Sequence, residues 1–267
     1  MMKYALITNL TRDIDGKCSQ NAAEILNKAG GTAAFYDDMD AVPEDVDIVI
    51  TFGGDGTLLH AATEAAARHK PILGVNMGTL GYLTELEAAE INALSRLEQG
   101  DYTLEKRMLL EVNVLRAGEC VYHDHALNDV VVTHGEIMRV IPLRFSCGGH
   151  EIKRFRGDGI IVSTPTGSTA YSLSAGGPVV DPTADSIILT PLSAHELRAN
   201  SFVFSPEREV EIGIEDLENR SAFLSADGRE TFRLASGDEI RLRRSPEKAE
   251  LVKLRDEGFF TVLYRKL

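Results

Sequence analysis

A glycine-rich segment with a single carboxylate follows an apolar run at residues 47–52, and it reads Gly53-Gly-Asp-Gly-Thr57. It lacks the GK[ST] ending of a Walker loop, and it is not the GxGxxG fingerprint of dinucleotide-binding proteins. Glycines on both sides of Asp55 leave room for a ligand, and the N-terminus of the helix expected next offers free N–H groups to an anion. Asp55 would repel a phosphate unless it takes a proton from an attacking hydroxyl or binds the Mg²⁺ that accompanies ATP. Both roles indicate phosphoryl transfer; the alternative is a tight turn in which Asp55 only caps the helix.

A second segment concentrates hydroxyl groups and glycines between residues 156 and 178. It opens with Arg156-Gly-Asp158 and later reads Thr169-Ala-Tyr-Ser-Leu-Ser174. Hydroxyls can bind a ribose, an amide or a base edge, Asp158 can accept from a ribose or a carboxamide, and Tyr171 can stack on a ring. The alternative is a polar surface loop, which explains the glycines and serines but not the Arg-x-Asp spacing.

Between these segments, Leu127-Asn128-Asp129 ends an expected strand. Asparagine presents a donor and an acceptor together, as an adenine edge requires, and Asp129 can accept from ribose hydroxyls. Taken as an isolated pair, the two residues are also typical of an ordinary turn.

Composition limits the partners that such a site can have. The chain has 28 Lys and Arg against 41 Asp and Glu, for a formal net charge of −13. That field repels nucleic-acid phosphates and anionic lipids, so we expect neither a nucleic acid nor a membrane as partner. An anionic ligand must therefore be held locally, by backbone N–H groups, a few Arg or Lys side chains, or Mg²⁺.

The cysteines and the N-terminal segment favour a cytoplasmic protein. Cys18, Cys120 and Cys147 show no CxxC spacing, which indicates neither a disulfide framework nor a thiolate metal site. The first residues show no signal-peptide pattern, and no apolar run approaches the length of a membrane span.

The elements that must position these segments predict two domains and a returning tail. In residues 1–100, strand-like and helix-like runs alternate, which predicts an α/β domain with a doubly wound, mostly parallel sheet and a ligand crevice at the carboxyl ends of its strands. Thr84 and Glu87 are expected to form the capping box of a helix that stops near Gly100. In residues 101–250 the period changes to two, with frequent hairpin signals, which predicts an all-β, sandwich-like domain. Residues 251–267 regain helical spacing and are expected to pack back on the first domain.

Over nearly its whole length the chain resembles the bacterial NAD kinases. The resemblance rests on the Gly53–Thr57 loop, on Asn76-x-Gly-x-Leu-Gly-Tyr82, on Leu127-Asn128-Asp129 and on residues 158–178. It implies phosphorylation of the adenosine 2′-hydroxyl of NAD to NADP, by ATP or polyphosphate, with Mg²⁺ or another divalent metal carried by ATP and no metal ligand assigned to the protein. It also implies a homodimer or homotetramer.

The resemblance assigns roles to single residues. Asp55 corresponds to the general base with Gly56 beside it, and His60 lies where many members have a basic residue facing the phosphates. Asn128 and Asp129 correspond to ligands of the adenosine part of NAD, although the family often has Glu where this chain has Asp129.

The other residues assigned to NAD binding come from three parts of the chain. They are Tyr82, Arg139, Arg156, Asp158, Thr169, Ala170, Tyr171, Ser172, Leu173, Ser174 and Arg229. Arg139 and Arg229 lie in segments with little motif similarity, where a solvated surface arginine is the alternative. Tyr171 and Ser174 are expected to serve a neighbouring subunit's site.

Three other functions stay open from the residues alone. A lipid kinase shares the glycine-Asp-glycine loop, but membrane docking favours a basic surface, unlike this acidic chain. A sugar kinase resembling phosphofructokinase shares the first motif and lacks the Thr-Ala-Tyr segment. A non-catalytic dinucleotide sensor would keep the pocket, but it would have no need of Asp55.

Overall fold

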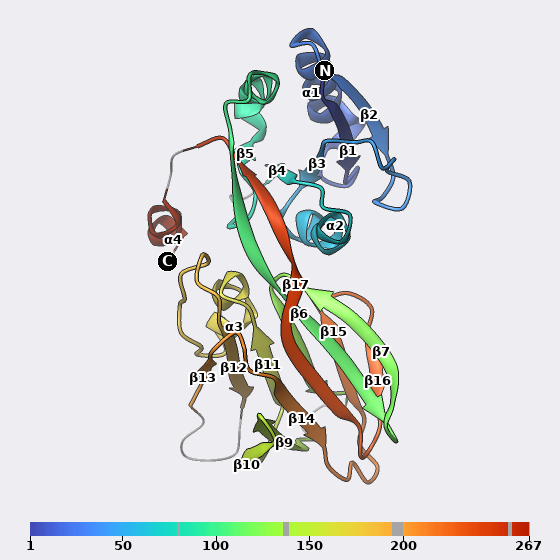
Figure 1. Ribbon diagram of the computed structural model, residues 1–267, viewed down its shortest axis with the longest axis vertical. Coiled ribbons are helices and arrows are strands. Elements are labelled where there is room, and N and C mark those ends of the chain that lie inside the picture. Colours follow the sequence, from blue (N-terminus) through green and yellow to red (C-terminus); the bar gives the residue numbers. More distant parts are fainter. Residues whose placement is uncertain (79–80, 136–138, 194–199, 256–257, 267) are drawn as a thin grey trace. The chain divides into compact units, whose positions relative to one another are not determined.

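The computed structural model describes residues 1–78, 81–135, 139–193, 200–255 and 258–266 (Figure 1). The chain divides into two units. The first consists of Met1–Arg107 and Glu247–Leu267, and the second of Met108–Pro246. Two long strands, β6 (Thr103–Arg116) and β17 (Glu239–Lys253), have residues in both units. The domain boundaries expected at residues 100 and 250 stay predictions; residue 250 lies inside β17.

The first unit contains a parallel sheet. Its strands are β1 (Lys3–Thr8), β2 (Thr32–Tyr36), β3 (Ile48–Gly53), β4 (Ile72–Asn76) and the short β5 (Leu86–Glu87). They lie in the order β2-β1-β3-β4, and both β5 and β17 pair in parallel with β4. Gly53 is opposite Asn76 in the β3–β4 pair, so the carboxyl ends of these strands meet at one edge. The expected α/β domain is confirmed.

Helices supply the apolar side chains that bury this sheet. They are α1 (Lys17–Lys28), α2 (Asp55–Ala67) and the 3₁₀ helix η2 (Ala88–Gln99); the short η1 (Ile14–Gly16), with Ile14 exposed, precedes α1. Leu26 of α1 and Leu94 of η2 pack in one core with the strand residues Ile50 and Leu73, all of them fully buried. Because apolar residues cover the sheet, β3 and β4 are buried along their whole length, as their continuous apolar runs predict.

The capping box expected at Thr84 and Glu87 is wrong. The strand β5 occupies residues 86 and 87, so η2 begins three residues later than expected, and its capping box pairs Glu87 with Glu90. Gly100 ends η2 in the left-handed conformation, as expected. Thr84 is thereby left free for another role.

The second unit is built from antiparallel strands. Six of them form one sheet in the order β13 (Phe202–Phe204), β12 (Ile187–Leu192), β11 (Gly159–Ser163), β8 (Asp129–His134), β15 (Ala222–Ala226) and β16 (Phe232–Leu234). A second layer contains β7 (Glu119–Ala126), β9 (Ile141–Cys147), β10 (His150–Gly157) and β14 (Val210–Ile214) with parts of β6 and β17. Side chains of both layers, such as Val132 and Phe145, share one core. The expected all-β domain is confirmed.

Tight turns close the hairpins of this unit where glycine allows a left-handed backbone. Gly118 joins β6 to β7, and Gly148 with Gly149 joins β9 to β10; all three have positive φ. Two short helices, η3 (Thr166–Thr169) and α3 (Tyr171–Ser174), follow β11. The Ser- and Thr-rich segment thus leaves the sheet at the end of a buried strand.

The C-terminal segment belongs to the first unit, as expected. After β17, the amides of Leu254 and Arg255 both donate to the buried Glu85 carboxylate at 2.7 Å, and Lys253 also contacts it. The chain ends in α4 (Phe259–Lys266), which confirms the helical spacing. Among the described helices, none is both long and apolar enough to cross a membrane.

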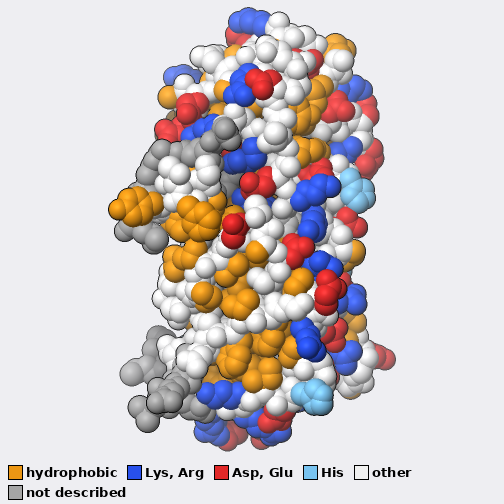
Figure 2. All heavy atoms as spheres, turned by 60° about the vertical axis from the view of Figure 1, so that its left-hand side comes forward, with side chains coloured by type: hydrophobic (Ala, Val, Ile, Leu, Met, Phe, Trp, Pro, Cys, Tyr) orange, Lys and Arg blue, Asp and Glu red, His pale blue; other side chains and the backbone are white. Residues whose placement is uncertain are grey.

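Apolar side chains also reach the surface of the second unit. In Figure 2 the left-hand side of Figure 1, where β13 lies, has been turned toward the viewer. Hydrophobic side chains gather on this face. Val203 on this edge strand is 57% exposed, whereas the half-buried rings of Phe202 and Phe204, stacked 6.1 Å apart, pack against the core. An exposed apolar edge strand is a surface that proteins commonly cover by pairing.

Candidate functional site

In the first unit, the carboxylate of Asp55 is held by a second loop rather than by its own helix. Gly54 is the N-cap of α2 and makes no side-chain cap, and Asp55 is the first helical residue. Its Oδ2 accepts the Tyr82 amide at 2.7 Å, and its Oδ1 accepts the amides of Leu83 at 3.1 Å and Thr84 at 3.2 Å. The helix-capping alternative for Asp55 is therefore wrong. Both loops follow strands whose carboxyl ends adjoin, which is why they meet.

The glycines around Asp55 have two different reasons to be glycine. A Cβ at Gly81 would lie 2.0 Å from Asp55 Oδ1, so the anchoring loop can approach the carboxylate only with glycine there. A Cβ at Gly54 or Gly56 would meet nothing within 4 Å, and neither residue has a positive φ. Packing within the chain therefore does not require these two glycines, and the space beside them is open to a ligand.

Thr84 lies beside the Asp55 carboxylate and is not among the candidates that the sequence indicates. It is 8% exposed, and its Oγ1 has no hydrogen-bond partner among the described residues. A Cβ at Gly81 would come within 2.4 Å of that oxygen as well as within reach of Asp55, so the hydroxyl lies beside the anchored carboxylate. An unpaired buried hydroxyl is costly, which suggests that a ligand completes it. Its place two residues after Tyr82 was the available signal.

Of the other residues expected in the first unit, His60 is exposed on α2 and Tyr82 is partly buried in the anchoring loop. Asn76 closes the start of that loop: its Oδ1 accepts the Gly78 amide at 3.1 Å, and its Nδ2 donates to the Gly78 carbonyl at 3.3 Å. Fixing this loop indirectly fixes the amides that hold Asp55.

In the second unit, the turn at Leu127–Asp129 has its backbone groups almost fully paired. The Asp227 carboxylate accepts the amides of Leu127, Asn128 and Asp129 at 2.7, 2.8 and 3.1 Å. Thr164 donates from its Oγ1 to the Leu127 carbonyl at 2.5 Å and from its amide to the Asn128 carbonyl at 2.9 Å. The side chain of Asn128, in contrast, has no hydrogen-bond partner among the described residues. Its donor and acceptor are free for a ligand.

Asp129 lies inside the protein beside the charge of Asp227. It is 6% exposed, and burial together with the Asp227 carboxylate raises the pKa of Asp129 to about 7. This carboxyl therefore keeps its proton to a higher pH than an ordinary aspartate does. It can donate a hydrogen bond as well as accept one.

Asp158 is held where β10 passes into β11. Its amide donates to the Leu192 carbonyl at 3.0 Å, and its carbonyl accepts from the His134 amide at 3.0 Å and from Thr133 Oγ1 at 3.1 Å. The carboxylate stays 41% exposed, with Oδ1 3.5 Å from His134 Nε2. The backbone is fixed while the carboxylate faces outward, as a ligand-binding group requires.

The Thr169–Ser174 stretch divides into two sets of side chains. Thr169 and Ser172 are buried; Thr169 Oγ1 donates to the Thr166 carbonyl at 3.2 Å, and Ser172 Oγ lies 3.0 Å from Thr190 Oγ1. These hydroxyls hold the fold. Ala170 and Leu173 are half-buried, and Tyr171 and Ser174 are exposed, with 49% of Tyr171 open to solvent. The outward set can meet a ligand.

The three predicted arginines differ in their surroundings. Arg229 is 21% exposed in its side chain and binds Asp124 at 2.9 Å and the Ala226 carbonyl at 3.2 Å, so it is not a solvated surface arginine. Arg139 and Arg156 are exposed. Arg229 is therefore part of the internal framework of this unit.

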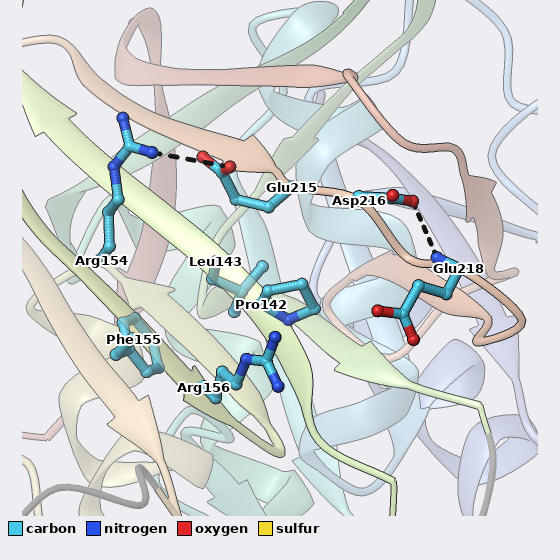
Figure 3. A pocket seen from close by; sticks show the side chains of 8 residues that line it. All are labelled: Pro142, Leu143, Arg154, Phe155, Arg156, Glu215, Asp216 and Glu218. Atoms are coloured by element: carbon cyan, nitrogen blue, oxygen red, sulfur yellow. Dashed lines mark hydrogen bonds and ion pairs between the residues drawn. The ribbon is translucent and has the colours of Figure 1, made fainter.

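Arg156 also lines a hollow of about 570 Å³, the size of many small-molecule sites. In Figure 3 the Arg154 guanidinium faces Glu215, 3.7 Å away, while the Asp216 carboxylate accepts the Glu218 amide at 2.9 Å. Pro142, Leu143 and Phe155 supply the apolar wall. The hollow does not gather Asn128, Asp158 or Tyr171, so it is not the predicted NAD site.

Known protein families match both units. The model of the ATP-NAD kinase N-terminal domain matches residues 9–102, and the model of the ATP-NAD kinase C-terminal domain matches residues 127–254. The chain belongs to the NAD kinase family. The NAD kinase of Acetivibrio thermocellus is 36% identical over 281 residues, which cover 100% of this chain and 97% of that protein.

Solved structures agree with this membership in the NAD kinase family. An NAD kinase from Archaeoglobus fulgidus in complex with ATP is 27% identical and has a TM-score of 0.79, over 99% of this chain and 98% of that one. The yeast NADH kinase complexed with NADH has a TM-score of 0.86 at 21% identity, over 100% and 87% of the two chains. The second likeness is one of fold.

Proposed function

We propose that this member of the NAD kinase family transfers the γ-phosphoryl group of ATP to the 2′-hydroxyl of the adenosine ribose of NAD, with Asp55 as the general base. The observation that supports this most directly is the Asp55 carboxylate, fixed by three amides beside glycines whose outer faces are open. Such a group can meet a hydroxyl without moving. Pre-positioning of this kind is what phosphoryl transfer asks of a protein.

The hydrogen bonds of Asp55 indicate which oxygen takes the proton. A carboxylate offers about four lone-pair directions. Oδ1 accepts two amides and Oδ2 accepts one, so Oδ2 keeps a free direction. We assign to Oδ2 the hydrogen bond from the 2′-hydroxyl, whose proton passes to it as the oxygen attacks the γ-phosphorus, the bond to the β–γ bridging oxygen breaks and ADP leaves.

For NAD binding, the free amide of Asn128 matches an adenine edge. Asp129 would contact the adenosine ribose, donating or accepting according to its proton. Asp158 would accept from the carboxamide or the ribose, and the exposed ring of Tyr171 would stack on a base. Arg156 and Arg139 are assigned to the dinucleotide by resemblance alone, whereas the internal contacts of Arg229 favour a framework role.

The phosphoryl donor ATP needs protein groups that bind its phosphates. The free N–H groups at the start of α2 can donate hydrogen bonds to phosphate oxygens, and the exposed His60 on the same helix can face those oxygens. Among the described residues, no cluster of three or more His, Cys, Asp or Glu side chains could hold a metal. Mg²⁺ would be carried by the phosphate oxygens of ATP, with Asp55 as a carboxylate in the same site, and when bound it would neutralise phosphate charge. Polyphosphate would use the same groups.

We further propose a cytoplasmic homo-oligomer, a dimer or a tetramer. The edge strand β13, with Val203 exposed on it, supplies a surface for pairing. The outward Tyr171 and Ser174 would then serve a neighbour's NAD site.

One substrate panel tests the activity. The purified protein is incubated with Mg·ATP and, separately, with NAD, NADH, diacylglycerol and fructose 6-phosphate, and each phosphorylated product is measured. NADP formation supports the proposal. A phosphorylated lipid or sugar in its place, or binding of NAD with no product, would support a lipid kinase, a sugar kinase or a sensor instead.

A further inference from the structure

The turn that carries Asn128 is held by a residue almost a hundred positions away. Asp227 lies in the turn between β15 and β16 with a positive φ of 50°, and its two oxygens accept three consecutive amides of Leu127–Asp129. The Asp227 amide in turn donates to the Asp129 carbonyl at 2.9 Å. This is a two-way attachment between β8 and the β15–β16 turn.

Thr164 holds the carbonyl side of the same turn. Its hydroxyl and its amide occupy the Leu127 and Asn128 carbonyls, and its Oγ1 accepts the Gly167 amide at 3.0 Å. A Cβ at Gly167 would lie 2.0 Å from the Asn128 carbonyl oxygen, so this segment is packed directly against the turn. The backbone of the turn is thus paired on both sides. The amide of the Asn128 side chain is left as its free polar group.

We propose that Asp227 is a positioning residue for NAD binding, which acts together with Thr164 by fixing the backbone that presents the Asn128 amide to the nucleotide. This inference rests on the proposed function, because it assumes that Asn128 binds NAD. Asp227 itself is partly buried, and both of its carboxylate oxygens accept from the backbone of the turn, so its effect on the ligand passes through Asn128.

The chemistry of the anchor requires a carboxylate at residue 227. Three N–H donors converge on two oxygens, which suits an ionised carboxylate and does not suit an amide, whose NH₂ group would face an N–H. The neighbouring Asp129 carboxyl accepts none of these amides. Burial raises the pKa of Asp227, and the three amides act against that rise by favouring its charged form; Asp129 has no such amides.

The test compares Asp227→Asn with Asp238→Asn. Asp238 is fully buried; it accepts two hydrogen bonds from Arg116 and one from the Ala235 amide, all at 2.8 Å. Its variant therefore also loses a carboxylate that accepts three hydrogen bonds, but leaves the Asn128 turn intact. We expect Asp227→Asn to raise the KM for NAD about tenfold or more while kcat changes less than about threefold. Asp238→Asn should lose thermal stability with KM unchanged. An equal rise of KM in both variants, or none in Asp227→Asn, overturns the inference.

Coupling to Asn128 distinguishes positioning from general weakening. In an Asn128→Ala background, Asp227→Asn should add less than about twofold to KM, because the group that it positions is gone. Independent, multiplicative effects would contradict the inference. Thr164→Val keeps the shape of the side chain and loses the hydroxyl, so it should raise the KM for NAD. Thr164→Ser keeps the hydroxyl and should have a KM close to that of the wild type.

Hydrogen exchange separates this inference from the proposed function. Without substrate, the amides of Leu127, Asn128 and Asp129 should exchange faster in Asp227→Asn than in the wild type, and at the wild-type rate in Asp238→Asn. Unchanged exchange of these amides in Asp227→Asn would show that Asp227 does not hold the turn. If the wild type forms no NADP yet these amides depend on Asp227, the proposed function fails while the anchor itself stands.

Discussion

The Tyr82 amide donates to Asp55 Oδ2 at 2.7 Å, across 27 residues of chain. Two neighbouring amides bind the other oxygen, so the carboxylate is oriented by a backbone whose groups cannot titrate. A parallel arrangement occurs in the second unit, where Asp227 accepts three consecutive amides. Asp55 is itself the proposed reactive group, whereas Asp227 holds the turn that carries the proposed NAD-binding residue Asn128.

Gly56→Ala should lower activity and leave stability nearly unchanged. A methyl group there meets nothing within the chain, so it intrudes only on a ligand. We expect a thermal midpoint within about 2 °C of the wild type, since surface changes cost about 0.5 kcal/mol or less, and kcat/KM lower by about tenfold or more. Gly81→Ala is the contrast, because its methyl group collides with Asp55 and should lower both quantities. Wild-type kinetics in Gly56→Ala would remove the open glycine face from the site.

Thr84→Val should stabilise the protein slightly or leave its stability unchanged, and should lower kcat. The change keeps the shape and removes a buried hydroxyl without a described partner, which is neutral or favourable for folding. If a ligand uses the hydroxyl, turnover falls by several-fold or more, and Thr84→Ser restores it. Melting curves and steady-state kinetics on the three proteins decide this; full turnover in Thr84→Val would show that the hydroxyl is not used.

Asp129→Asn should change how stability depends on pH. The pKa of Asp129 is about 7 in the folded protein, against about 4 in an unfolded chain, so the folded state binds more protons between these values. The contribution of Asp129 to wild-type stability therefore falls as pH rises from about 4 through 7. The asparagine variant lacks this loss. The difference in free energy of unfolding between the variant and the wild type should therefore grow toward pH 8 in favour of the variant, to the order of a few kcal/mol. Denaturant unfolding at pH 5 and pH 8 measures it, and a pH-independent difference would contradict the buried-acid account.

Mixing two inactive variants tests a site shared between subunits. Inactive Asp55→Asn chains mixed with Tyr171→Ala chains should regain some activity once subunits exchange, because some mixed interfaces then hold one intact site. Light scattering should give a mass of at least two 29.2 kDa chains at micromolar concentration. A single-chain mass rejects the oligomer; an oligomer that exchanges subunits without complementation rejects the shared site.

Local patterns predicted the elements of the fold well. The apolar run before Gly53 and the alternation in β6 fix strand type through period and burial, and glycines mark the hairpin turns. The helix start expected at Thr84 is wrong, and the helix begins after Glu87. A two-residue strand that carries no pattern of its own lies between.

The site was less accessible to sequence reasoning than the fold was. The types of Asp55 and Asn128 indicate chemistry, but the groups that hold them are backbone amides and an aspartate 98 to 100 residues away, which no local spacing reveals. The unpaired Thr84 hydroxyl and the internal contacts of Arg229 likewise depend on tertiary packing. Residue types identified candidates, and three-dimensional pairing separates their roles.

The most direct test of the central claim is the turnover of Asp55→Asn with saturating NAD and Mg·ATP, read beside NAD affinity from calorimetry. Asparagine keeps the size of the side chain and loses the base, so the account predicts a kcat lower by about 10²-fold or more with NAD affinity within several-fold of the wild type. Turnover close to that of the wild type would contradict the assignment of Asp55 as the base.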